Sequence, residues 1–423
     1  MSKKKKLIPE MRFPKFKSEE EWDNVALGKI SEIVRGGSPR PIQDFTTTDV
    51  DGLNWLKIAD VPSDSKFITG TKERVIAEAL NSTREVNPGD LILSNSMSFG
   101  RPYILKIKTC IHDGWIAIRK ISNKTFENYL YYFISSESSQ TYFNSNAAGA
   151  AVKNLNAEII KLLPIHFPKN KKEQEKIAST LSSLDEVIEA HSQKLDLLKE
   201  HKKGLMQNLF PQEGETIPKY RFKEFEKYGN WKKTTIDKIA KVSAGGTPES
   251  TNPDYWNGDI PWMNSGELNN KRIHSVSNFI TSKGLKESST KLIPPKCVLI
   301  GLAGQGKTRG TAAINYIELC TNQSIGSIHP NEYAFDSEFL YQKIDSMYDK
   351  LRYLSAGDGG RGGLNLQIIK EIELFLPEMK EQQKIASCLS ALDKLITAQL
   401  EKIEQLRQHK KGLMQGLFPK MID

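Results

Sequence analysis

The residues Gly301–Thr308 spell GLAGQGKT, which satisfies the phosphate-binding pattern G-x-x-x-x-G-K-[ST] letter for letter. Such a loop binds nucleotide phosphates through its backbone N–H groups and through the N-terminus of the helix that follows it. Here Gly310 comes two residues after Thr308, where that helix should begin, and the next segment, TAAINYIEL, has no helical periodicity. We therefore predict a strand–loop–strand at this place. A nucleotide hydrolase that uses this loop is kept as an alternative function.

Other residue patterns that could support catalysis are weak. Asn252–Tyr255, NPDY, differs by one letter from the N-P-P-[YF] motif with which amino-methyltransferases hold a flipped base, and no glycine-rich S-adenosylmethionine loop precedes it. We interpret it as a turn. The seven histidines are scattered and none has metal-ligand spacing. The sequence therefore predicts a binding protein with no catalytic residues, no metal site and no cofactor of its own.

The composition of the chain favours a polyanionic partner. Its 423 residues carry a formal net charge of +9, and such a basic balance suits nucleic acid or a membrane surface. No apolar run approaches the roughly 20 residues that a membrane helix needs, so we expect no membrane-spanning segment. The predicted partners do not include a membrane. The four cysteines have no C-x-x-C spacing, which favours a reducing, cytoplasmic location.

An internal duplication is the strongest signal in the sequence. Glu173–Pro211 and Glu381–Pro419 align without a gap at a constant offset (381 − 173 = 208), and 24 of the 39 aligned positions are identical. Fainter echoes join the preceding regions, such as RGGSP from Arg35 and AGGTP from Ala244. The chain therefore alternates a globular region with a long helix, twice.

Both predicted helices carry a heptad seam, with apolar residues at alternating spacings of four and three. The two seams include Ile177, Leu181, Leu184, Ile188, Leu195, Leu198 in the first copy and Ile385, Leu389, Leu392, Ile396, Ile403, Leu406 in the second. We predict that the two helices form a coiled coil, most simply by packing on each other within the chain. Two seam positions are polar in each copy, His191 and Lys202 and then Gln399 and Lys410. They either fix the register or mark places where the stripe leaves the seam.

The globular regions are predicted to be mixed α and β, which gives an α+β fold with a pseudo-twofold duplication. A turn followed by a strand is expected over Asn87–Ser94 and a strand over Tyr103–Ile111. Helices are expected at Thr125–Ser136 and Phe335–Met347. The predicted domains are a first globular domain over 1–168, a helical tract over 169–211, a second globular domain over 212–377, and a C-terminal helical tract over 378–423.

Glycine-rich loops with basic residues recur in paired positions of the two globular regions. Gly100-Arg101 in the first copy is taken as the counterpart of Gly306-Lys307 in the second. A glycine permits close approach of the backbone to a ligand, and an adjacent cation suits a phosphate or a guanine edge. These loops, together with the positive charge, favour binding to DNA.

The pattern resembles the specificity subunit of a type I restriction–modification system. The family tract E-Q-x-K-I-A, followed by a heptad helix and K-K-G-L-M-Q-x-L-F-P, is present twice, and Gly245–Leu268 resembles the opening of a family target-recognition domain. The resemblance implies that each globular region reads one half of an interrupted, asymmetric site in double-stranded DNA. It also implies that each globular region is a target-recognition domain. The two helices would pack antiparallel, act as a spacer and dock partner subunits. The candidate DNA-contacting residues are Arg35, Arg40, Ser94, Asn95, Arg101, Lys153, Thr247, Lys307, Arg309, Arg361.

The resemblance further implies assembly with two adenine-N6 methyltransferase subunits and with ATP-dependent motor–nuclease subunits. S-adenosylmethionine, ATP and Mg would then belong to those partners. A coiled-coil scaffold that never touches DNA is the other alternative function.

Overall fold

The structure, a computed structural model, describes residues 7–61, 65–95, 99–147, 154–304, 308–355 and 363–420. Its contacts divide the chain into two compact units, Met1–His191 with Lys402–Asp423, and Ser192–Glu401. Each unit contains one globular region and one stretch of each long helix. Because the units combine these parts, the predicted domain boundaries at residues 168, 211 and 377 stay a prediction.

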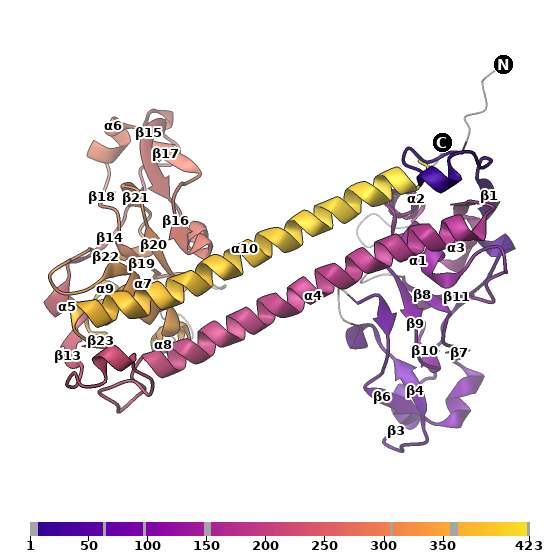
Figure 1. Ribbon diagram of the computed structural model, residues 1–423, viewed down its shortest axis with the longest axis horizontal. Helices are drawn as coiled ribbons and strands as arrows, with labels where there is room; N and C mark the ends of the chain where they lie inside the picture. The colour runs from indigo at the N-terminus through magenta and orange to yellow at the C-terminus, as the bar shows by residue number, and fades with distance from the viewer. Residues whose placement is uncertain are drawn as a thin grey trace. The chain divides into compact units, whose positions relative to one another are not determined.

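The globular region of the first unit is built on two five-stranded sheets, in the orders β2-β11-β8-β9-β5 and β3-β6-β4-β10-β7 (Figure 1). Its strands are β1 Asp23–Ala26, β2 Glu32–Arg35, β3 Thr46–Thr47, β4 Leu53–Leu56, β5 Phe67–Ile68, β6 Glu73–Val75, β7 Arg84–Val86, β8 Leu91–Ser94, β9 Pro102–Leu105, β10 Thr109–Ile111, β11 Trp115–Arg119 and β12 Pro164–Phe167. Its helices are α1 Glu127–Ser135, α2 Glu137–Asn146 and α3 Ala157–Leu162.

The globular region of the second unit repeats this plan with sheets ordered β14-β22-β19-β20-β16 and β17-β15-β21-β18. Its strands are β13 Lys232–Thr235, β14 Val242–Ala244, β15 Trp256–Met263, β16 Arg272–Ile273, β17 Asn278–Ile280, β18 Leu292–Ile293, β19 Val298–Gly301, β20 Ala312–Asn315, β21 Leu319–Thr321, β22 Ile325–Ile328 and β23 Glu373–Leu376. Its helices are α5 Ile236–Ile239, α6 Ser282–Lys286, α7 Ser337–Ser346, α8 Tyr348–Leu354 and α9 Leu366–Lys370. The predicted mixed α and β fold is confirmed.

Most local predictions hold, and one strand prediction is wrong. The predicted strand before Ser94 is β8, and the two predicted helical stretches are α1 and α7. Tyr103–Ile111 is not one strand but parts of two, β9 and β10, which belong to different sheets. Lys106 and Lys108 are exposed because they lie in the turn between these strands. Their alternation with Leu105 and Ile107 gives the same apolar–polar pattern as a single half-buried strand.

The two long helices are α4 Lys171–Leu209 and α10 Met379–Leu417. At 1.5 Å per residue, a helix of 39 residues is about 58 Å long. In the first unit the beginning of α4 shares a core with the end of α10, through Ile177 and Leu181 on one side and Leu417 on the other. The predicted antiparallel packing is therefore confirmed in this unit.

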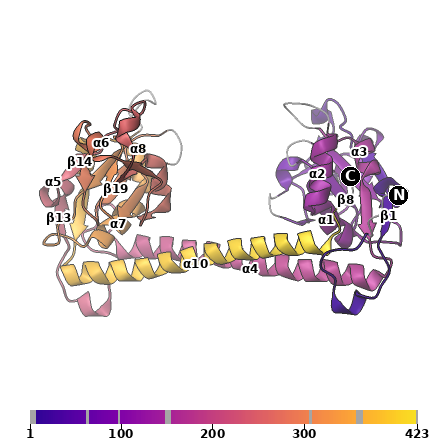
Figure 2. The same ribbon diagram turned by 90° about the horizontal axis from the view of Figure 1, so that it is seen from above.

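The second unit shows the reverse combination, because the end of α4 packs near the beginning of α10. Leu209 shares a core there with Ile385 and Leu389, and Figure 2 shows α7 between α10 and strand β19. Every predicted seam residue of both helices is buried or half-buried. The amphipathic pattern thus gives the inward face of both helices correctly.

Equivalent ion pairs fix the start of each helix to its own unit. Arg12 donates to both carboxylate oxygens of Glu173 at 2.7 and 2.8 Å, and Arg221 donates in the same way to Glu381 at 2.7 Å twice. Both glutamates are only 1% exposed. A bidentate arginine supplies the hydrogen bonds that a buried carboxylate requires.

The polar seam positions also have equivalent partners. Lys202 lies 2.7 Å from Asp393 in the second unit, and Lys410 forms an ion pair with Asp185 in the first. Since the two aspartates are also related by the offset of 208, the same lysine–aspartate contact occurs twice between α4 and α10. This arrangement supports the interpretation of the lysine positions as register-fixing contacts.

Candidate nucleic-acid interface

A Gly-Gly loop follows β2 in the globular region of the first unit. The N–H of Gly36 donates to the carbonyl oxygen of Trp115, and that of Gly37 donates to the carbonyl oxygen of Ile111. A Cβ atom on Gly36 would lie 2.1 Å from the carbonyl oxygen of His112. Only glycine therefore permits this loop to lie against the turn between β10 and β11.

The globular region of the second unit has the same loop after β14. Gly245 and Gly246 donate to the carbonyl oxygens of Ile325 and Thr321. A Cβ on Gly245 would lie 2.0 Å from the Thr321 carbonyl oxygen. The paired Gly-Gly motifs of the sequence are therefore two copies of one close backbone approach.

The turn between β10 and β11 brings several predicted DNA-contacting residues of the first domain together. Arg35 Nε and Asn95 Nδ2 both donate to the backbone oxygen of Asp113, each at 3.0 Å. The Asp113 carboxylate accepts a 2.9 Å hydrogen bond from Ser38 and lies 3.6 Å from the Arg40 guanidinium. The hydrogen bond from Ser38 is the main reason that the pKa of Asp113 is lowered, so this carboxyl group is ionised at neutral pH.

Beside Asp113, the imidazole of His112 is neutral. Burial between Trp55 and Trp115 lowers the pKa of His112, and its Nδ1 accepts a 2.8 Å hydrogen bond from the N–H of Gly114. Since Nδ1 is an acceptor here, its distance of 3.6 Å from Asp113 is not an ion pair. His112 therefore shapes the turn and adds no charge to it.

In the second domain, the turn between β21 and β22 has different side chains. Thr247 Oγ1 donates to Gln323 Oε1 at 2.5 Å, which is the counterpart of the contact from Ser38 to Asp113. Trp262 Nε1 donates a buried hydrogen bond to the carbonyl oxygen of Gly246 and so holds the loop in place. Thr247 and Gln323 are both exposed, so the polar surface of this loop and turn is accessible to a ligand.

The loops after β8 and β19 correct the predicted pairing of basic residues. Gly100 and Gly310 both have positive φ, and they donate to the carbonyl oxygens of the equivalent residues Ser94 and Gly301. The counterpart of Gly100 is therefore Gly310, and the prediction that Gly306 matches it is wrong. The loop from Gly301 to Gly310 is longer than the loop from Ser94 to Gly100. A sequence comparison without the strand register cannot show where the additional residues lie.

The remaining predicted contact residues have mixed positions. Ser94 is 0% and Asn95 5% exposed, so their side chains lie within the domain. Arg101 is half-buried against the ring of Tyr103, at 5.3 Å from its centroid. Arg309 donates to Ser355 at the end of α8. The predictions for Lys153, Lys307 and Arg361 lie outside the described residues.

Two exposed turn residues were missed by the sequence analysis, Asp113 and Gln323. The segments TCIHDGW and LCTNQSI around Cys110 and Cys320 have a spacing of 210 and could have revealed them. The strand register confirms this equivalence, because Cys110 pairs with Trp55 and Cys320 with Trp262. Short segments with one shared cysteine are too weak a signal to align without the sheets.

Two of the patterns considered for catalysis have other structures in the parts of the chain that the structure describes. Thr308 is followed within four residues by strand β20, not by the helix that a phosphate-binding loop needs. Asn252–Tyr255 forms the predicted turn, a 3-10 turn (Pro253–Tyr255) whose Asn252 side chain accepts from the N–H of Asp254. No group of three or more metal-ligating side chains occurs among the described residues. Within the same residues, no helix is long and apolar enough to cross a bilayer.

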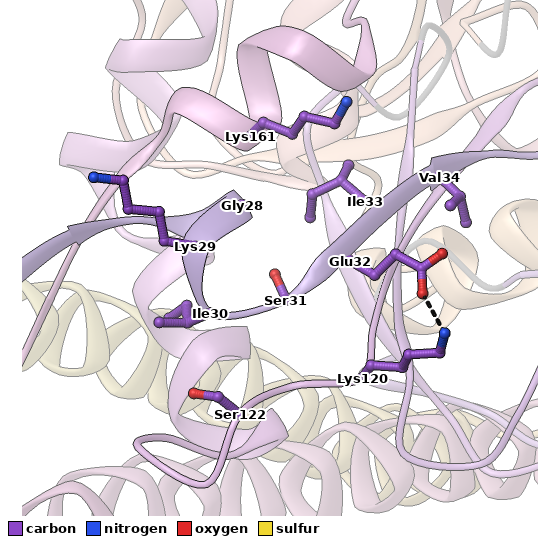
Figure 3. A pocket seen from close by; sticks show the side chains of 10 residues that line it. All are labelled: Gly28, Lys29, Ile30, Ser31, Glu32, Ile33, Val34, Lys120, Ser122 and Lys161. Atoms are coloured by element: carbon purple, nitrogen blue, oxygen red, sulfur yellow. Dashed lines mark ion pairs between the residues drawn. The ribbon is translucent and has the colours of Figure 1, made fainter.

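A polar pocket of about 580 Å³ lies at the opposite end of β2 from Arg35 (Figure 3). Lys29, Lys120 and Lys161 line it, but Lys120 pairs with Glu32 and Lys161 pairs with Glu158. Much of its positive charge is therefore compensated. The Gly-Gly loop and the turn at the other end of the sheet are the better candidate for contact with a polyanion.

Comparison with known proteins identifies the class to which this fold and these loops belong. A family model described as the type I restriction modification DNA specificity domain matches residues 19–200 and again 228–407. The two matches cover most of the chain and follow its internal duplication. The protein therefore belongs to the family of type I restriction–modification DNA specificity proteins.

Individual relatives agree with this assignment. The chain is 24% identical over 415 residues to a putative type I restriction enzyme MjaX specificity subunit of Methanocaldococcus jannaschii, covering 94% of this chain and 93% of the relative. It is 30% identical over 209 residues to the EcoR124I/EcoR124II specificity subunit of Escherichia coli, covering 47% of this chain and 50% of the relative. The crystal structure of a type I restriction–modification S subunit from M. genitalium has the same fold, with a TM-score of 0.60 at 14% identity over 98% of this chain and 100% of that one.

Proposed function

We propose that this chain selects the DNA sequence on which a type I restriction–modification complex acts. Each recognition domain reads one half of an interrupted, asymmetric site in double-stranded DNA. The observation that carries this proposal is the repeated Gly-Gly loop and turn, which has the same backbone hydrogen bonds in both domains but different side chains at its tip. A duplicated scaffold with unlike contact residues suits a site with two unlike halves.

The first domain has the charge that DNA binding needs at this tip. Arg35 is exposed and the side chain of Arg40 is 83% exposed. Arginine can donate to phosphate oxygens or to the O6 and N7 atoms of guanine. Among the predicted residues, Arg35, Arg40, Thr247 and the partly exposed Arg101 and Arg309 are kept as proposed DNA contacts. Ser94 and Asn95 are proposed to support the loop from within.

The paired helices offer two equivalent surfaces to partner subunits. Val187 on α4 is 44% exposed and Leu395, which is its equivalent on α10, is 55% exposed. Apolar residues that recur in solvent at matching positions suit two copies of one partner. We therefore propose that two methyltransferase subunits dock on the helices and that motor–nuclease subunits join them for restriction.

In this proposal the chain itself is not an enzyme. S-adenosylmethionine, ATP and Mg belong to the partner subunits, which work with it in the cytoplasm. Burial raises the pKa of Cys110 and Cys320 to about 11, so these two thiols stay protonated at neutral pH.

The test is single-molecule sequencing of methylated bases in host DNA, with and without this gene and with its methyltransferase partner present. We expect N6-methyladenine at one bipartite, interrupted motif that depends on the gene. Absence of any gene-dependent motif, with the partner shown to be active, would refute the proposal. It would favour a scaffold that does not bind DNA.

A second measurement compares Arg40 with Glu249, which follows the second Gly-Gly loop at the matching place. Arg40→Ala is expected to weaken DNA binding by the assembled complex. If Arg40 contacts a phosphate, the negative slope of the logarithm of the binding constant against the logarithm of the salt concentration also becomes shallower by about 0.9. Glu249→Ala removes a negative charge from the equivalent position and serves as the matched control, for which no weakening is expected.

A further inference from the structure

The turn between β10 and β11 and the turn between β21 and β22 are built by the same hydrogen bonds. The N–H of Trp115 donates to the His112 carbonyl, and the N–H of Ile325 donates to the Asn322 carbonyl, at 3.0 and 3.2 Å. The side chains of His112 and Asn322 also accept from the N–H two residues later, at 2.8 and 3.2 Å. The residue that directly follows His112 in the first domain and Asn322 in the second is therefore held at the tip of the turn.

That tip residue is Asp113 in the first domain and Gln323 in the second. Each is oriented by the hydroxyl group that follows its Gly-Gly loop, Ser38 for Asp113 and Thr247 for Gln323. The Asp113 side chain is 44% exposed, and Gln323 is exposed. Two equivalent, pre-oriented and accessible positions thus carry different hydrogen-bonding groups.

We propose that positions 113 and 323 are equivalent base-reading positions of the two recognition domains. This inference rests on the proposed function and names residues that determine which bases each domain selects. An ionised carboxylate only accepts hydrogen bonds, so Asp113 can take one from the N4 amino group of cytosine. Arg40, 3.6 Å away, can donate to the guanine of the same base pair.

Gln323 has both donor and acceptor groups. Its carboxamide matches the N6 and N7 atoms of adenine. The contact from Thr247 uses one lone pair of its oxygen and leaves the second lone pair and the amino group for a base. The first domain therefore reads a C·G pair with Asp113 and Arg40, and the second reads an A·T pair with Gln323.

The experiment uses the complete methyltransferase complex with the wild-type chain and with two nearly isosteric variants, Asp113→Asn and Gln323→Glu. The methylated motif of each is determined by sequencing. Binding to synthetic sites with every base pair at the affected position is measured by competition. The matched control is Asp51→Asn, an exposed aspartate of the first domain on a different loop.

We expect each variant to change one position in one half-site and to leave the other half-site as it is. Gln323→Glu should shift that position from A·T toward C·G, and Asp113→Asn should lose the preference for C·G. A single base-reading contact is worth about 1–3 kcal/mol, so discrimination at that position should fall by about 5- to 150-fold. The Asp51→Asn complex should reproduce the wild-type motif.

Two results would overturn the inference while the proposed function stands. One is a wild-type bipartite motif that both variants reproduce unchanged. The other is a loss that affects both half-sites equally in either variant, because a base-reading residue acts only on its own half. Absence of a motif in the wild-type complex is a different result, and it would refute the proposed function itself.

Discussion

The two recognition domains differ most where their backbones are most alike. Both place a Gly-Gly loop against a turn through the same backbone hydrogen bonds. At the tip, the first domain has Asp113 beside Arg40, while the second has Gln323, with Glu249 in place of the arginine. A rigid, repeated scaffold with variable tip residues permits a new DNA sequence to be read without a new fold.

The attachment of each domain to the helices shows the opposite relation, because the side chains themselves are retained. Arg12 with Glu173 and Arg221 with Glu381 are the same contact, as are Lys410 with Asp185 and Lys202 with Asp393. The two glutamates are buried and the lysine–aspartate pairs are half-buried, so a lost partner leaves a charge with reduced solvation. Their surroundings nevertheless differ between the units, and those differences can be tested.

The largest effect is expected from removing the bidentate arginines. Arg12→Ala and Arg221→Ala each leave a glutamate that is 1% exposed without its cation, which should destabilise the unit concerned by about 3–5 kcal/mol. Hydrogen exchange measured by mass spectrometry on the full chain can assign the loss to one unit or the other. Equal deprotection of both units by a single variant would contradict the division into two units.

A smaller effect is expected for the lysines at the polar seam positions. The loss of stability should differ between Lys202 and Lys410. Asp393 keeps Arg272 and Gln342 as partners when Lys202 is removed, whereas Asp185 keeps the hydroxyl group of Tyr132. Lys410→Met should therefore cost about 1–3 kcal/mol and Lys202→Met less than about 1 kcal/mol.

Denaturant unfolding of the full-length variants provides this measurement. The charge exchange Asp185→Lys with Lys410→Asp is the control, since it restores an opposite pair and should recover part of the loss. A larger cost for Lys202→Met than for Lys410→Met would show that the surrounding partners do not compensate as the structure indicates.

An effect of about the same size as that of Lys202→Met, but opposite in sign, is expected at Lys343 in the second unit, and it depends on pH. Burial lowers the pKa of Lys343 to about 8, and its ammonium group lies 5.1 Å from the ring centroid of Phe210. Below pH 8 the protein contains a charged, partly desolvated lysine, so Lys343→Met should stabilise the second unit by about 1 kcal/mol at pH 7.

This gain should shrink as the pH rises from about 8 toward 10. In that range the folded wild-type protein has released the proton while its unfolded state still binds it, so wild-type stability increases with pH. Unfolding of both proteins across this range checks the prediction, with Lys291→Met as an exposed-lysine control in the same unit. A stability difference that does not change with pH would mean that packing, not charge, determines the effect.

Much of the architecture could be predicted from the sequence because its signals are local or repeated. The heptad positions of α4 and α10 gave the buried face of each helix, and the 208-residue offset revealed two copies of one plan. The missing helical pattern after Thr308 correctly predicted the strand β20 instead of a nucleotide-binding loop. Periodicity determines such features with little help from distant residues.

The candidate site was predicted only in part. Arg35 and Arg40 were found because they flank a conspicuous Gly-Gly loop, but Ser94 and Asn95 proved to be buried at the end of β8. A polar residue next to a loop gives no signal of which way its side chain points. That direction depends on the neighbouring strand, which here comes from a distant part of the chain.

The sequence by itself determined that the chain is duplicated, that its long helices pair along an apolar seam, and that its basic glycine-rich loops recur. Only the tertiary structure decided that Gly100 corresponds to Gly310 and that Asp113 and Gln323 occupy the same turn. The physical reason is that strand pairing sets these equivalences through hydrogen bonds between residues far apart in the chain. Loops of unequal length conceal such equivalences from any comparison along the sequence.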